Sequence, residues 1–392
     1  LVPAELRSGC VIRRAEYLLR VGRAAEAQAE LAALLALEPN NGDVLALEAI
    51  IAVVQNDKAA ALHFAQRAVT AAPNAFRPYA ALSYAQQANF KLEEAFDAAK
   101  RAAELAPDSA LLRARTAELQ LSLGRVRSAE RKAIEAVRTN PNESRAHLIL
   151  GFVHLAQIDT KKAAEDFTRA IELDSTEPLA RLGLGLATIR EGRLQEGREQ
   201  IEIAVALDPT NSLVRSYVGK AYYEENTKER DRLAATQFGL AKALDPNDPT
   251  PWFYDAILKQ TQNRPVEALE DLQKSIALND NRAVYRSRLA LDEDLASRTA
   301  DASRIYRDLG FSRVAFAEAS RSLMVDPINP SALRFLAEVY GSLPRQEISE
   351  VSALLQAQLR QPLSANPLLP QVREDSLFVP YGAGPLSINS FE

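Results

Sequence analysis

The sequence predicts an all-α fold, a right-handed superhelical solenoid of about ten helical hairpins followed by an extended C-terminal tail. Three observations lead to this prediction. A proline recurs at a fixed spacing, the composition favours helix, and each repeat unit divides into two amphipathic halves. The length of 392 residues exceeds what one compact core normally holds, which also favours an elongated repeat array.

The repeat is most visible in a proline that follows a short apolar run. Its slots, each 34 residues after the one before, hold Pro39, Pro73, Pro107, Pro141, Ser175 and Pro209. Only one of these slots has lost the proline. A fixed period of roughly 20 to 50 residues is typical of stacked supersecondary units.

The composition is that of a helical protein. Hydrophobic residues make up 47% of the chain, alanine and leucine are abundant, and there are only 15 glycines. The net charge of -5 argues against binding through phosphate neutralisation, so no nucleic-acid partner is expected. The single cysteine, Cys10, excludes an intrachain disulfide and a cysteine-based zinc site.

No targeting or membrane segment is predicted within the chain. No apolar run approaches the roughly 18 residues that a membrane-spanning helix needs, so no transmembrane segment is expected in this chain. The start at Leu1 rather than Met is consistent with a processed or excised segment. A targeting signal would then lie outside the sequence.

One repeat, residues 178–211, contains two amphipathic helices at about 179–191 and 194–207. Gly192 stands where the first helix must stop and reverse, a place that suits a residue tolerant of positive φ. The same slot holds Gly22, Gly124 and Asn56 in other repeats. Pro209 cannot continue the second helix, because it lacks the N–H and clashes with the preceding turn.

Small residues recur where two helices of a hairpin must cross closely. The eighth position of successive repeats holds Ala49, Ser83, Ala117, Gly151, Gly185 and Gly219, and the twentieth holds Ala27, Ala61, Ala95, Ala129 and Ala163. This pattern resembles the tetratricopeptide repeat, which has a small residue at position 8, alanine at 20 and 27, and proline at 32. Position 27 holds alanine in six repeats, as Ala68, Ala102, Ala136, Ala170, Ala204 and Ala241. The departures are Leu34 at position 27 of the first repeat and Gly197 at position 20 of the sixth.

The resemblance covers about residues 8 to 361 and gives a division of the chain. We predict an N-terminal lead-in over 1–7, eight hairpins over 8–282, an inserted helix over 283–295, two further hairpins with a C-terminal cap over 296–361, and an extended tail containing Pro and Gly over 362–392. The breaks in spacing set these bounds. Between Pro209 and Pro246 the period lengthens to 37 residues, which places three extra residues near 225–232.

No catalytic, cofactor-binding or metal-binding residue is predicted, so we do not expect an enzyme. His147 and His154 share one helix face, but packing explains them better than a metal site, which would need a third ligand. The acid pair Glu224 and Glu225 is expected on solvated helix surface.

The resemblance implies a concave groove lined by the first helix of each repeat, and here its positions are apolar. The predicted partner-binding residues are Ile50, Val53, Tyr84, Leu121, Leu148, Phe152, Leu155, Leu182, Leu186, Ile189, Tyr223, Phe253 and Ile257. A long apolar groove would mark the site of a protein or peptide segment. The alternative is that these side chains pack against neighbouring repeats. The positions that would hold a terminal-carboxylate clamp in such proteins are apolar or acidic here.

The tail is one candidate for that segment. Its apolar anchors are Leu369, Val372, Leu377 and Phe378, and it contains no helical pattern of its own. The chain's own tail is therefore a possible occupant of the groove. The alternative is that it links the array to another part of a larger protein.

Two segments, 285–311 and 382–392, resemble parts of large bacterial envelope proteins in which a tetratricopeptide array precedes an outer-membrane barrel. This resemblance implies a scaffold in an envelope, secretion or export assembly, located in the periplasm or associated with the outer membrane. The alternative is a cytoplasmic adaptor in a multiprotein complex.

Overall fold

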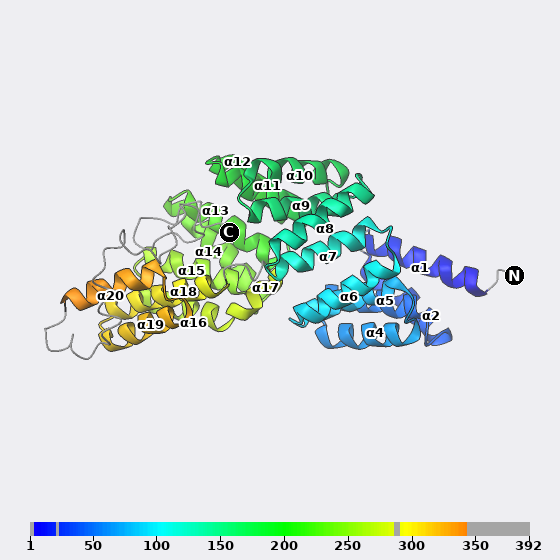
Figure 1. Ribbon diagram of the computed structural model, residues 1–392, viewed down its shortest axis with the longest axis horizontal. Helices are drawn as coiled ribbons and strands as arrows, with labels where there is room; N and C mark the ends of the chain where they lie inside the picture. The colour runs from blue at the N-terminus through cyan, green and yellow to red at the C-terminus, as the bar shows by residue number, and fades with distance from the viewer. Residues whose placement is uncertain (1–3, 21–22, 286–290, 343–392) are drawn as a thin grey trace. The chain divides into compact units, whose positions relative to one another are not determined.

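The computed structural model describes residues 4–20, 23–285 and 291–342. Every regular element in these ranges is a helix (Figure 1). The first sixteen helices are α1 (Ala4–Arg20), α2 (Ala24–Leu37), α3 (Gly42–Val54), α4 (Lys58–Ala71), α5 (Phe76–Ala88), α6 (Leu92–Leu105), α7 (Ala110–Ser122), α8 (Val126–Thr139), α9 (Ser144–Ala156), α10 (Thr160–Leu173), α11 (Pro178–Arg190), α12 (Leu194–Leu207), α13 (Ser212–Glu224), α14 (Lys228–Leu244), α15 (Pro249–Thr261) and α16 (Pro265–Ala277). They are followed by η1 (Asn279–Asn281), α17 (Arg282–Tyr285), α18 (Leu291–Asp308), α19 (Ser312–Val325) and α20 (Pro330–Ser342).

The helices pair in chain order. Helices such as α5 and α6, or α18 and α19, lie side by side as hairpins (Figure 1). Consecutive hairpins also pack together, as α6 does on α7 and α14 on α15. The predicted all-α solenoid is therefore confirmed. The predicted tenth hairpin and cap extend past Ser342, and the whole predicted tail, including Leu369, Val372, Leu377 and Phe378, lies outside the described residues.

The predicted division into domains stays a prediction. Helix α1 begins at Ala4, inside the predicted lead-in. The predicted inserted helix over 283–295 coincides with the end of α17 and the start of α18, with residues between them outside the described ranges. The extra residues after Glu225 lengthen α14 to 17 residues, against 14 in α12.

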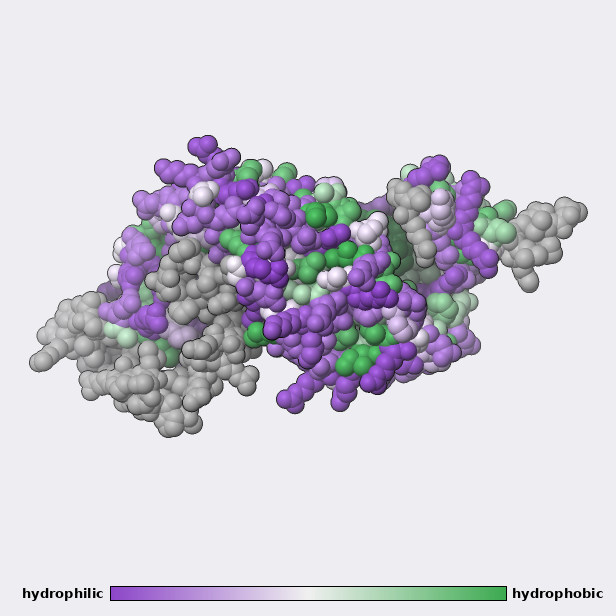
Figure 2. All heavy atoms as spheres, turned by 90° about the horizontal axis from the view of Figure 1, so that it is seen from above, coloured by the Kyte–Doolittle hydropathy of each residue, from purple (hydrophilic) through white to green (hydrophobic). Residues whose placement is uncertain are grey.

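The chain divides into two compact units, residues 1–153 and 154–392, with the boundary inside α9. In the first unit the core consists largely of alanine, with clusters around Ala49, Ala81 and Ala117. In the second unit the largest cluster contains aromatic residues, among them Tyr217, Phe238 and Tyr254. On the face shown in Figure 2, hydrophilic side chains cover most of the described surface and hydrophobic ones appear between them in patches.

The helices begin at polar caps and end at the predicted turns. The side chain of Asn41 accepts hydrogen bonds from the amides of Asp43 and Val44, which satisfies N–H groups that the first turn of α3 leaves unpaired. Gly124, Gly192 and Asn56 take positive φ (75°, 87° and 59°), as their slot predicted. Gly22 lies outside the described residues.

Ile158 occupies the same left-handed turn with φ of 66°, although it is β-branched. The left-handed conformation costs most residues roughly 1–2 kcal/mol, but asparagine tolerates it because its short side chain hydrogen-bonds locally. Ile158→Asn is therefore expected to raise the free energy of unfolding by about 1 kcal/mol. Urea unfolding followed by circular dichroism measures this. Ile203→Asn is the matched control, since Ile203 is also exposed but lies within α12. Equal effects of the two substitutions would contradict the strain argument.

The small-residue positions lie at close helix crossings, as predicted. The alanines at position 20, such as Ala61 and Ala163, are completely buried. In the sixth repeat, α11 and α12 meet at two glycines. A β-carbon on Gly185 would lie 2.7 Å from the carbonyl oxygen of Gly197, and one on Gly197 would lie 2.5 Å from that of Gly185.

Candidate functional site

The predicted groove residues divide into two sets by burial. The buried ones are Leu148, Leu182, Leu186, Ile189, Tyr223 and Ile257. The half-buried ones are Ile50, Val53, Tyr84, Leu121, Phe152, Leu155 and Phe253. The structure thus does not present the whole stripe to solvent.

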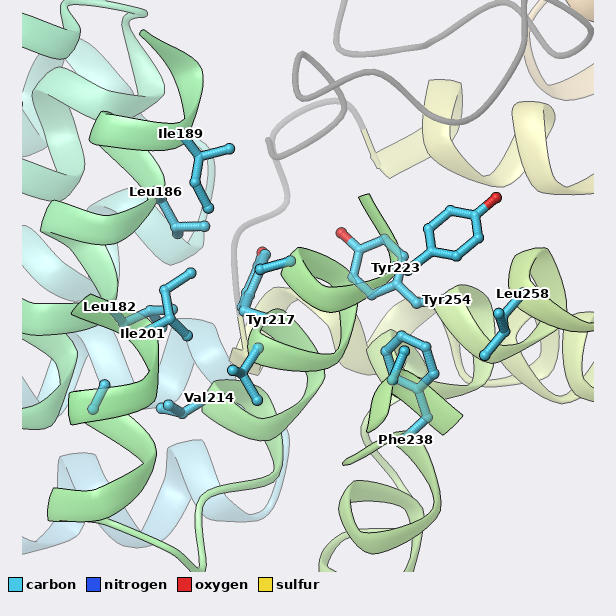
Figure 3. Packing of buried hydrophobic residues seen from close by; sticks show 14 of the residues in the cluster. Leu182, Leu186, Ile189, Ile201, Val214, Tyr217, Tyr223, Phe238, Tyr254 and Leu258 are labelled. Atoms are coloured by element: carbon cyan, nitrogen blue, oxygen red, sulfur yellow. The ribbon is translucent and has the colours of Figure 1, made fainter. Parts of the chain in front are cut away.

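The buried set belongs mainly to one hydrophobic cluster of the second unit. Figure 3 shows Leu182, Leu186 and Ile189 along α11, with Val214 and Tyr217 on α13. Tyr223 and Ile257 are members of the same cluster. These side chains pack between repeats, which was the alternative explanation, and little of their surface is exposed in this structure.

The half-buried residues keep part of their surface accessible, and several of them pack against the hydrophobic clusters. On α3, Ile50 and Val53 pack against an alanine-rich cluster that includes Ala81 and Ala85. In the second unit, Leu155 and Phe253 pack against the aromatic cluster. Whether this set contacts a partner stays a prediction.

Tyr84 is held by a buried arginine that the sequence analysis did not single out. The guanidinium of Arg115 lies 3.8 Å from the centroid of the Tyr84 ring. Arg115 is fully buried, and it donates to Ser83 Oγ at 3.2 Å and to Gln87 Oε1 at 2.6 Å. The ring of Tyr84 is therefore fixed in orientation by contacts across α5 and α7.

The same arginine is neutralised by Glu118. Carboxylate oxygens of Glu118 lie 3.1 Å from Arg115 Nη1 and 3.0 Å from Arg145 Nη2. Burial alone would raise the pKa of Glu118, but the two guanidinium groups outweigh it and hold the pKa at about 2. Glu118 is thus ionised at any physiological pH. Arginines at positions 6 and 2 of successive repeats, with Glu118 between them at position 9, were the sequence signal for this network.

A second arginine joins three successive first helices in the first unit. Arg77 on α5 makes ion pairs with Glu16 on α1 (3.2 Å) and with Asp43 on α3 (3.4 Å). We define the first-helix row of this unit as Ile50, Val53 and Tyr84. The helices that bear this row, α3 and α5, are joined by an ion pair.

In the second unit, Glu225 does not lie on solvated surface as expected. It pairs with Arg198, which is buried, and its other oxygen lies 2.6 Å from Arg230 Nε. Arg198 also pairs with Glu202 at 2.6 Å, and Tyr222 donates to the same carboxylate at 2.8 Å. Burial, aided by this hydrogen bond to Glu202, raises the pKa of Tyr222 to about 12.

The expectation of a solvated surface was also wrong for Glu224. Its side chain is only 5% exposed, and its nearest cation is Lys220 Nζ at 3.7 Å. Burial is the largest influence and raises the pKa of Glu224 to about 7. The apolar cluster that includes Tyr223 adjoins this end of α13.

The raised pKa makes stability depend on pH around Glu224. Folding favours the protonated carboxyl, so its contribution is complete below about pH 4.5 and is lost as the pH rises through about 7. We expect the stability of Glu224→Gln relative to the wild type to rise by about 1–3 kcal/mol between pH 5 and pH 8.5, because only the wild type must ionise a buried carboxyl, whereas the loss of the partner of Lys220 is common to both pH values. Urea unfolding at the two pH values measures this. Glu94→Gln is the control, since Glu94 is exposed; a pH-independent difference for Glu224→Gln would contradict the assignment.

Four charged side chains form a closed square between α14, α15 and α16. Lys242 contacts Asp255 and Asp271, the latter at 2.8 Å, and Lys259 contacts the same two carboxylates, with 3.2 Å to Asp255. Lys242 also lies 4.5 Å from the Trp252 ring. Each charged group has two neighbours of opposite charge, so this buried square is a structural element of the hairpin stack.

The described residues contain no group of three or more His, Cys, Asp and Glu side chains arranged to hold a metal ion. His154 Nδ1 instead lies 2.7 Å from Asp166 Oδ2. Nor is any helix in the described ranges long and apolar enough to cross a membrane.

Comparison with known proteins gives the same architecture. The tetratricopeptide repeat family model matches residues 12–76, 114–178 and 153–212. No curated protein matches the sequence. Among solved structures, the crystal structure of the APC/C hetero-tetramer Cut9-Hcn1 is similar with a TM-score of 0.66 and 16% identity over 84% of this chain. The match covers 62% of that chain, less than two thirds of its length.

A second similar structure is the human IFIT1 dimer with PPP-AAAA. Its TM-score is 0.54 and its identity 16%, over 82% of this chain and 85% of that one. At these identities the likeness shows the fold alone.

Proposed function

Because this chain belongs to the tetratricopeptide-repeat family, we propose that it is a non-enzymatic scaffold that binds a segment of a protein partner along the first helices of its hairpins. One observation carries the proposal. In the first unit the first-helix row of Ile50, Val53 and Tyr84 stays half-buried, while the helices that bear it are tied together by ion pairs. A row of accessible apolar side chains on successive first helices is suited to ordering an extended or helical segment.

A photo-crosslinking experiment tests this in the full chain. A benzophenone amino acid in place of Tyr84 is expected to capture a protein partner in cells of the source organism, whereas the same probe in place of Lys100, which is exposed on the second helix α6, is not. Ile50→Asp should abolish capture while the helical circular dichroism signal stays unchanged. Equal capture from both positions, or capture that survives Ile50→Asp, would count against the first-helix row.

The chain's own tail remains a candidate occupant of this surface. We propose that Leu377 and Phe378 compete with an external partner. Changing both to aspartate in the full chain is then expected to increase capture at position 84. No change would favour the tail as a linker.

We further propose that the scaffold serves a bacterial envelope, secretion or export assembly in the periplasm or at the outer membrane. The support is the resemblance of residues 285–311 and 382–392 to such proteins. The alternative is a cytoplasmic adaptor. Immunoblotting of periplasmic, membrane and cytoplasmic fractions from source cells separates the two.

The proposed partner is protein and not nucleic acid. The net charge of -5 supports this, because phosphate neutralisation needs an excess of basic side chains. The similar human IFIT1 structure contains PPP-AAAA, so the same oligonucleotide is the right probe. Fluorescence anisotropy with labelled PPP-AAAA is expected to show no binding. Saturable binding that weakens with salt would replace the protein proposal with a nucleic-acid one.

A further inference from the structure

The exposed side of α14 (Figure 1) differs in composition from those of α6 and α10. All exposed residues of α6 are charged, and five of the six on α10 are. On α14, none of the exposed residues from Leu233 to Leu244 is charged. These residues, which we call the α14 face, are Leu233, Ala235, Thr236, Gly239, Leu240, Ala243 and Leu244. Since helix surfaces that meet water are normally polar, this composition is suited to packing against protein.

Three leucines form one edge of the α14 face. Leu233, Leu240 and Leu244 are 38%, 43% and 39% exposed. Their spacing of seven and then four residues aligns them along the helix. They therefore offer a row of apolar side chains to a second helix.

Small residues form the other edge. Ala235, Gly239 and Ala243 follow one another every four residues, and a β-carbon on Gly239 would meet nothing within 4 Å. Glycine inside a helix is less favourable than alanine, and no contact within this chain requires it at this position. Residues of this size allow the backbone of a second helix to approach closely.

We propose that the α14 face packs against the α14 face of a second copy of this chain, with the two helices antiparallel. In a two-fold pair of antiparallel helices the same edge of each helix meets, so leucines contact leucines and small residues contact small residues. With Gly239 opposite Gly239 of the second copy, Ala235 lies opposite Ala243. Leu233 then lies beside Leu244. The α14 face is thus self-complementary, as an isologous dimer interface requires.

Charge favours this occupant and this direction. Arg232 is exposed at the N-terminal end of the α14 face and makes no ion pair within the described residues. An antiparallel second copy brings to it the C-terminal end of α14, where Asp245 is the cap and the last carbonyls carry partial negative charge. A parallel copy would instead place Arg232 against Arg232.

The dimer does not depend on the first-helix proposal, because α14 is the second helix of its hairpin and bears no residue of the first-helix row. One helix pair covers less surface than a standard protein interface. We therefore expect a reversible dimer with a dissociation constant in the micromolar range.

Sedimentation velocity of the full chain tests the dimer. The fraction of dimer is expected to rise with protein concentration, and Leu240→Asp is expected to raise the dissociation constant at least tenfold with an unchanged helical circular dichroism signal. Leu111→Asp is the matched control, because Leu111 is 45% exposed on α7 and lies outside the α14 face. A chain that stays monomeric, or a dimer that Leu240→Asp leaves intact, would overturn the proposal. A monomer that dimerises only when Leu377 and Phe378 are changed to aspartate would overturn it in favour of the tail as the occupant.

Disulfide cross-linking tests the direction of the two helices. All variants carry Cys10→Ser, because Cys10 is exposed. A mixture of Ala235→Cys and Ala243→Cys chains is expected to form the mixed disulfide, and Gly239→Cys to cross-link with itself. Preferential cross-linking of Ala235→Cys chains to one another would overturn the antiparallel arrangement.

Discussion

Replacing Asp271 by alanine is expected to lower the free energy of unfolding by about 3–5 kcal/mol. Asp271 is one of two carboxylates between Lys242 and Lys259, and its side chain is only 6% exposed. Without it, two largely buried ammonium groups share Asp255 alone. The loss comes mainly from an uncompensated buried charge, because water does not reach the two lysines well enough to replace the missing carboxylate.

The contrast with an exposed pair isolates the effect of burial. Arg264 and Glu267 form an ion pair in the same hairpin, with both side chains about half exposed. Glu267→Ala is expected to lower stability far less than Asp271→Ala does, since solvent screens such exposed pairs. Urea unfolding of both variants, followed by circular dichroism, gives the comparison.

The double substitution Lys259→Met with Asp271→Leu separates the charge from the packing. If the cost of Asp271→Ala arises from an unpaired ammonium, removing one lysine together with one aspartate should recover most of the lost stability. A double variant that is as unstable as Asp271→Ala would place the cost in lost packing instead. A loss below about 1 kcal/mol in Asp271→Ala itself would mean that solvent reaches the square.

The sequence predicted the hairpins because their signals are local. Pro209 cannot be accommodated inside a helix, and Gly124, Gly192 and Asn56 occupy turns whose positive φ suits their residue type. Ile158 and Phe90 also have positive φ, although their residue types do not favour it. There, the packing of the two flanking helices sets the turn, and no local signal reports it.

The burial of the predicted groove could not be deduced from position in the repeat. Leu186 and Ile50 both occupy position 9, yet Leu186 is buried and Ile50 is half-buried. The difference lies in the neighbours. Leu186 belongs to a cluster with Tyr217 and other aromatic residues, whereas the cluster beside Ile50 is built from small side chains such as Ala81. Burial therefore depends on the residues of the adjoining repeat.

The sequence did not predict the buried networks of charged side chains, for a related reason. Arg115 and Glu118 lie three residues apart on α7, a spacing that ordinarily describes an exposed surface pair. Their burial depends on Tyr84 and on Arg145, which come from the preceding and following hairpins. Glu224 likewise is buried by the stacking of its hairpin, although acid pairs at a helix end are normally solvated.

Gly197→Ala is expected to lower stability by about 1–3 kcal/mol, although alanine is the residue that this position holds in other repeats, among them Ala61, Ala129 and Ala163. The new β-carbon would lie 2.4 Å from Ile189 Cγ1 and 2.5 Å from the carbonyl oxygen of Gly185. Neither contact is possible without moving α11 away from α12, because the oxygen belongs to a rigid helix backbone. The gain in helix propensity from glycine to alanine, about 1 kcal/mol, does not offset this overlap.

Gly239→Ala supplies the control, because Gly239 lies within α14 and a β-carbon there would meet nothing within 4 Å. That substitution is expected to stabilise the chain by about 1 kcal/mol through helix propensity alone. Hydrogen exchange resolves the two effects along the array, since repeats unfold locally. Protection should fall in α11 and α12 for Gly197→Ala and rise in α14 for Gly239→Ala. Increased protection in both variants would mean that α11 and α12 separate without cost, and that the two glycines are not required for their crossing.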